Sequence, residues 1–105
     1  MTGFRMTVTR AELPAIDAAA AAFDRALEGA ITNEHVSAAA AAYNAVLRRA
    51  VDAICEDTKH INTRPTIRQA LGKTRRNGLL FGHNPPAAIR MHIRKFEGLP
   101  GNEPI

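Results

Sequence analysis

The residues able to do covalent or metal chemistry are few and widely separated. The chain has one cysteine and four histidines, and only Cys55 and His60 form a pair close in sequence. A metal site needs three or four ligands in a defined geometry. The Gly-Lys-Thr sequence at residues 72–74 matches the end of a phosphate-binding loop, but Ile67 stands where that motif requires a glycine. The sequence therefore predicts no enzyme, no metal site and no cofactor.

Arginine and lysine carry the one chemical signal that stands out. Residues 58–96 contain nine basic side chains and no Asp or Glu, a net charge of +9, whereas residues 1–57 carry −3 and residues 97–105 carry −2. Such a stretch repels itself unless a polyanion or an acidic protein face neutralises it, and nucleic acid is the commonest polyanionic partner. We predict that the nucleic-acid-binding residues are Arg64, Arg68, Lys73, Arg75, Arg76, Arg90, Arg94 and Lys95.

The same segment is poor in aromatic side chains, which limits the kind of binding. Phe81 and Phe96 are its only two, and both are better explained as core residues than as platforms for stacked bases. We therefore expect contacts with the phosphate backbone, weak sequence preference and strong salt dependence. A solvated basic face without a partner, or one that docks an acidic protein, is the alternative.

Helices must position these cations, because large apolar residues recur at spacings of three and four along most of the chain. After an irregular arm over residues 1–8, we expect a helical hairpin over residues 9–60. Its first helix begins with a capping box at Thr9, and its second begins with an N-cap at Thr32 or Asn33. Two runs of five alanines, one in each helix, predict close packing within the hairpin.

The basic half follows over residues 61–97 as a connector and two shorter helices. The first of these is expected to begin at Thr66 and to end near Asn77, and the second to begin after an N-cap at Asn84. Both helix starts are expected to add backbone N–H groups to the anion surface. With a tail over residues 98–105, the whole chain is predicted to be one all-α domain, a small bundle of about four helices with a long alanine-rich hairpin.

Composition excludes several classes of protein. Apolar residues make up 46% of the 105 residues, but 20 of them are alanines, so the core is thin and we expect help from a partner surface. No run of apolar residues is long enough to span a membrane, and the first nine residues lack the apolar block of a signal peptide. We therefore expect a cytoplasmic protein, and the single cysteine excludes a disulfide framework.

One local resemblance concerns DNA binding. The sequence TIRQALGKTRRNGLL at residues 66–80 resembles the recognition helix of GntR-type winged-helix repressors. In that family a β-hairpin wing follows, whereas here Asn84-Pro85-Pro86 opens another helix. The resemblance implies a helix-turn-helix-like DNA-binding regulator that inserts a helix into the major groove.

In size, helical build and charge, the whole chain is similar to the small helical subunit of class 1 CRISPR effector complexes. That resemblance implies a non-catalytic RNA-binding subunit of a ribonucleoprotein complex of antiviral defence, with other protein subunits as partners and with RNA favoured weakly over DNA. The acidic first half and the basic second half also predict copies of the chain stacked head to tail. The alternative is a phage or plasmid structural or assembly protein, such as a helical adaptor or connector.

Overall fold

A computed structural model shows an all-α chain, as the sequence predicts, and it describes residues 3–61 and 64–105, without the side chains of residues 64–66. These ranges contain no strand. None of the helices within them combines the length and the apolar character needed to cross a lipid bilayer. The helices, in chain order, are α1 (Thr7–Glu28), α2 (Asn33–Asp57), α3 (Arg64–Leu71) and α4 (Pro85–Glu97).

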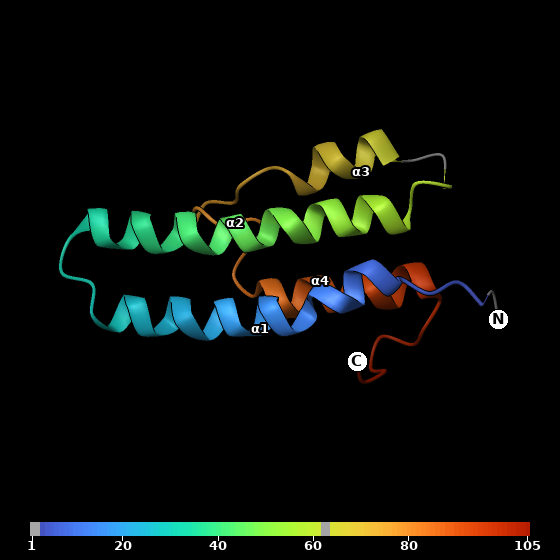
Figure 1. Cartoon of the computed structure of the whole chain (residues 1–105), viewed down its shortest axis with the longest axis horizontal. Helices are drawn as coiled ribbons and strands as arrows, with labels where there is room; N and C mark the ends of the chain where they lie inside the picture. The colour runs from blue at the N-terminus through green and yellow to red at the C-terminus, as the bar shows by residue number, and fades with distance from the viewer. Residues whose placement is uncertain (1–2, 62–63) are drawn as a thin grey trace.

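α1 and α2 form a long antiparallel hairpin in a molecule that measures 49 × 28 × 19 Å (Figure 1). α3 runs along α2 on the side away from α1, and α4 packs against α1 (Figure 1). Both shorter helices cover the half of the hairpin that holds the start of α1 and the end of α2. The other half, with the turn between the two long helices, projects beyond them.

The hydrophobic core lies in the covered half of the hairpin. Its large, fully buried apolar residues come from the N-terminal arm, from the α3–α4 connection and from three helices: Met6, Ile16, Leu47, Ile54, Leu80, Ile89 and Ile93. In the projecting half, Phe23 and Tyr43 pack with ring centroids 5.2 Å apart, while Ile31 is 86% exposed. Alanine gives this half close helix contact but little buried area, so the covered half supplies most of the hydrophobic stabilisation.

Local capping signals confirm the starts of α2 and α4. The Thr32 hydroxyl accepts a hydrogen bond from the His35 backbone N–H at 3.3 Å, and the Asn84 side chain accepts one from Ala87 at 3.4 Å. α4 ends at Gly98, whose φ of +72° is the left-handed conformation that glycine adopts without strain.

The start of α1 differs from the predicted capping box, because the helix begins at Thr7 and has no local side-chain cap. Its first N–H groups are instead satisfied by two carboxylates from the ends of other helices. Asp57 accepts hydrogen bonds from the Thr9 backbone and hydroxyl, both at 2.7 Å, and Glu97 accepts one from the Met6 backbone at 2.7 Å. Thr9 therefore lies inside the helix and acts as a donor to Asp57.

Two predicted helix ends also differ from the structure. α2 ends at Asp57 rather than near residue 60. At this end the Thr58 hydroxyl donates to the Ile54 carbonyl at 2.7 Å. α3 spans Arg64–Leu71 instead of residues 66–77, and Gly72 closes its last turn by donating to the Arg68 carbonyl at 2.9 Å. The Thr66 side chain, predicted to cap α3, lies outside the described part of the chain.

Candidate nucleic-acid interface

The predicted basic surface begins on α3, which is held on α2 by its few apolar residues. Leu71 is buried and Ile67 is partly buried against the core. Arg68 is exposed, and its Nη1 donates to the Asp52 carboxylate of α2 at 2.8 Å. This hydrogen bond raises the pKa of Arg68 above its usual value. α3 thus presents one described cation, and that cation already has an acidic neighbour.

Beyond α3 the chain makes a tight turn that we call the cationic loop, residues 72–78. The Arg75 backbone N–H donates to Leu79 at 2.8 Å, and its carbonyl accepts from Gly78 at 2.9 Å. Gly78 has a φ of +81°, a backbone conformation that is strained for a residue with a side chain. Lys73, Arg75 and Arg76 are all exposed on this turn, and none of them forms an ion pair within the described residues.

The cationic loop is fixed to the hairpin by Asn44 of α2. The Asn44 amide donates to the Gly78 carbonyl at 2.7 Å, and its oxygen accepts from the Leu80 backbone N–H at 2.9 Å. Asn44 is 9% exposed and Leu80 is fully buried. Because an amide that makes both hydrogen bonds has one favourable orientation, the loop leaves α2 in a defined direction.

Asn44 was not among the residues singled out from the sequence. The available signal was an asparagine inside an alanine-rich helix, where asparagine is unfavourable unless its side chain finds a partner. Nothing in the local sequence shows that the partner lies 34 residues further on.

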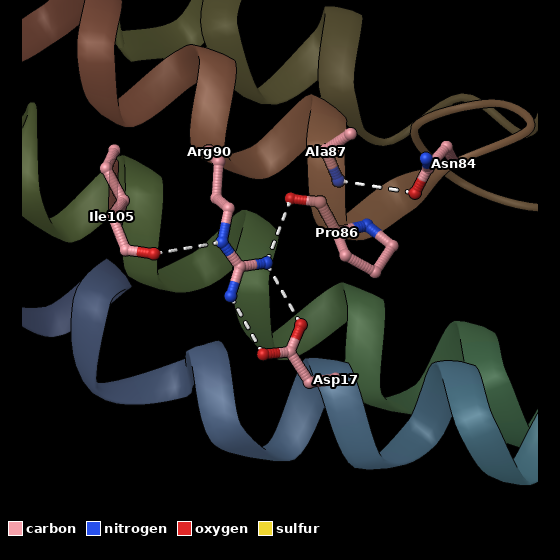
Figure 2. A network of polar contacts seen from close by, with 6 residues as sticks. All are labelled: Asp17, Asn84, Pro86, Ala87, Arg90 and Ile105. Atoms are coloured by element: carbon pink, nitrogen blue, oxygen red, sulfur yellow. Dashed lines mark hydrogen bonds and ion pairs between the residues drawn. The ribbon is translucent and has the colours of Figure 1, made fainter. Parts of the chain in front are cut away.

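On α4, Arg90 holds the fold together rather than facing solvent. Figure 2 shows its guanidinium against Asp17 of α1, with nitrogen–oxygen distances of 3.0 and 2.8 Å. The same group donates to the Pro86 carbonyl at 3.4 Å and to the Ile105 carbonyl at 3.5 Å. The hydrogen bond from Arg90 lowers the pKa of Asp17. This cluster joins α1, α4 and the C-terminal tail.

The other predicted cations of α4 divide between the tail and the solvent. Arg94 donates through Nε to the Glu103 carbonyl at 2.6 Å, which ties the tail to α4. Lys95 is exposed and has no ion pair in the described ranges. α3 packs along α2, whereas α4 packs against α1, so the predicted residues of these two helices belong to elements that pack on different helices of the hairpin (Figure 1). The Arg64 side chain lies outside the described part of the chain.

The start of α4 offers no backbone donor to an anion, contrary to expectation. Pro85 and Pro86 have no N–H, the Ala87 N–H is capped by the Asn84 side chain, and the Ala88 N–H donates to the Asn84 carbonyl at 3.0 Å. Among the described residues of the predicted site, Lys73, Arg75 and Arg76 of the cationic loop and Lys95 of α4 are thus exposed without an ion pair, and the three loop cations are the ones that lie together in sequence.

The described side chains include no group of three or more potential metal ligands. Cys55 is 2% exposed. The His92 ring lies between Phe81 and Phe96, with centroid distances of 6.1 and 6.5 Å, and burial lowers its pKa. These side chains serve packing in the positions that they occupy.

Comparison with known proteins found no matching family, no matching curated protein and no matching solved structure. The charges and contacts of this chain are therefore what indicates its function.

Proposed function

We propose that this chain is a non-catalytic subunit of a nucleoprotein assembly that binds the phosphate backbone of nucleic acid through its cationic loop. The observation that carries the proposal is that Lys73, Arg75 and Arg76 are exposed and unpaired within the described part of the chain. Three exposed cations lie within four residues, on a turn that Asn44 fixes to α2, and the described chain gives them no carboxylate partner.

Such a group suits phosphate for simple electrostatic reasons. Guanidinium groups donate in a planar fork that fits phosphate oxygens, and lysine adds a point charge. A turn of this length spans only two or three successive phosphates, so one copy binds weakly, and useful affinity requires several copies or other subunits. Because of this requirement we propose an assembly, and we favour RNA weakly over DNA as its nucleic acid. The two more specific identities, the small subunit of a class 1 CRISPR complex and a helix-turn-helix-like regulator, stay predictions.

A second candidate function, a helical assembly protein of a phage or plasmid, is favoured by the projecting half of the hairpin. An apolar groove of about 360 Å³ runs between α1 and α2 there, lined by alanines with Phe23, Tyr43 and Val46. The buried Tyr43 hydroxyl has no hydrogen-bond partner among the described residues. In this candidate, copies stack head to tail, with the acidic hairpin end near Glu28 and Glu34 against the cationic loop of the next copy.

The test compares two double variants that remove the same charge. Arg75→Ala with Arg76→Ala alters the cationic loop, whereas Arg25→Ala with Arg48→Ala removes two exposed arginines of the hairpin. We expect the loop variant to lose affinity for RNA and DNA of any sequence and to lower the salt slope by about two contacts, while the hairpin variant stays close to wild type. The measurement is fluorescence anisotropy of oligonucleotides of about 20 nucleotides, after nuclease treatment of the protein.

Equal affinity of the loop variant and wild type would overturn the nucleic-acid proposal. If neither binds an oligonucleotide but wild type forms salt-sensitive oligomers that the loop variant lacks, the assembly candidate replaces it.

A further inference from the structure

We propose that Asp52 sets the affinity of the cationic loop for polyanions, because its carboxylate competes with phosphate for the guanidinium of Arg68. The inference rests on the proposed function and deepens it. In this view the cationic loop is an open binding position for phosphate, and Arg68 beside it is a position that Asp52 occupies. A polyanion can enter the second position by displacing the Asp52 carboxylate.

The exposure of this pair separates it from the structural ion pairs of the molecule. Arg68 and Asp52 side chains are 56% and 67% exposed, and one nitrogen–oxygen contact of 2.8 Å joins them. Arg90, in contrast, is 22% exposed and makes two contacts with Asp17 and two with backbone carbonyls. An exposed pair with a single contact contributes little to stability, so it opens easily when a better acceptor arrives.

Arg68 is also adjacent to the cations that the proposal uses. It lies in the last turn of α3, and its own carbonyl accepts from Gly72, the first residue of the cationic loop, at 2.9 Å. A phosphate bound at the loop can therefore be followed along the strand by one at Arg68. Phosphate offers the same kind of acceptor as Asp52 but belongs to a chain of further charges, which favours the exchange.

Asp52 acts on that second phosphate in two ways. It holds one N–H group of the fork, and its negative charge repels any anion that approaches α3. Nearby on α2, Glu56 is paired with Lys59 at 2.6 Å, and Asp57 caps α1. Asp52 is thus the carboxylate of α2 that forms an ion pair with a described cation of the predicted site, Arg68.

The test is a double-variant cycle read by anisotropy with a labelled single-stranded RNA of about 20 nucleotides. Asp52→Asn is expected to raise affinity about threefold to fivefold and to steepen the salt slope by about 0.7, the value for one added phosphate contact on a single strand. Glu103→Gln is the matched control, since it removes one exposed carboxylate of the C-terminal tail. It is expected to leave the slope unchanged.

Arg68→Ala distinguishes competition from a general change in charge. In the wild-type background it is expected to change affinity little, whereas in the Asp52→Asn background it is expected to remove the whole gain. A gain that persists without Arg68, or that Glu103→Gln reproduces, overturns the role of Asp52 and leaves the proposed function intact. Failure of wild type and Asp52→Asn alike to bind the RNA at low salt overturns the proposed function itself. Thermal melts of all variants by circular dichroism check that each remains folded.

Discussion

The two sides of the hairpin carry similar numbers of arginines and use them differently. On the α4 side, Arg90 and Arg94 bind Asp17 and the C-terminal tail, and Arg10 of α1 pairs with the buried Glu97 at 2.7 Å. On the α3 side, Arg75 and Arg76 lie exposed on a tight turn, and neither pairs with a carboxylate of the described residues. The difference teaches that a basic segment does not define a basic surface, because the fold supplies acceptors to Arg90, Arg94 and Arg68 but none to Arg75 and Arg76 among the described residues.

The largest expected difference between the two sides is in hydrophobic stabilisation. Ile89 of α4 is fully buried, whereas Ile67 of α3 is only partly buried. We expect Ile89→Ala to lower the free energy of unfolding by about 2–5 kcal/mol, and Ile67→Ala by about 1 kcal/mol. Urea unfolding followed by circular dichroism measures both.

If Ile89→Ala does not fold, Ile89→Val keeps the comparison measurable, with an expected loss of about 0.5–1.5 kcal/mol. Equal losses at Ile67 and Ile89 would mean that α3 is as much a part of the core as α4.

The next effect is acid destabilisation through the α4 side. Hydrogen bonding by Arg10 lowers the pKa of Glu97 below its usual 4.5, and hydrogen bonding by Arg90 lowers the pKa of Asp17 below its usual 3.8. As pH falls below about 4.5, the unfolded chain therefore takes up protons before the folded one does, and stability is lost. We expect the melting temperature to be steady near neutral pH and to fall in this acid range.

Glu97→Gln tests the assignment of that acid effect. It is expected to lower stability at neutral pH by about 1–3 kcal/mol, because it weakens the contacts with Arg10 and the Met6 N–H, and to make the decline in acid shallower. Glu103→Gln, an exposed carboxylate in the tail, is the control. An unchanged acid decline in Glu97→Gln would place the titrating group elsewhere.

The smallest effect separates structural from free arginines directly. Arg90→Ala is expected to lower the free energy of unfolding by about 1 kcal/mol, since it removes a partly exposed but doubly hydrogen-bonded ion pair. Arg75→Ala is expected to leave the free energy of unfolding within about 0.5 kcal/mol of wild type, because the Arg75 side chain is exposed and forms no ion pair with the described residues. Nucleic-acid affinity should show the reverse order, and the same order in both measurements would contradict the comparison.

Elements whose signals lie within a few residues could be predicted from the sequence. The long hairpin follows from the spacing of its apolar residues and its alanines, and the starts of α2 and α4 follow from Thr32 and Asn84. The absence of acidic residues between positions 58 and 96 also identified the segment that holds every residue of the candidate site except Asn44 and Asp52.

Features that depend on distant partners could be decided only by the tertiary structure. The start of α1 is set by Asp57 and Glu97, which lie 48 and 91 positions away from the N–H groups that donate hydrogen bonds to them. The course of the cationic loop depends in the same way on Asn44.

The sequence by itself determined four helices and one strongly basic segment, because helix propensity, capping and net charge are properties of neighbouring residues. Tertiary structure decided which of those basic residues are available. Asp17 lies 73 positions from Arg90, and Asp52 lies 16 positions from Arg68. Whether a guanidinium faces a carboxylate or the solvent depends on how the helices pack, and that information is spread over the whole chain.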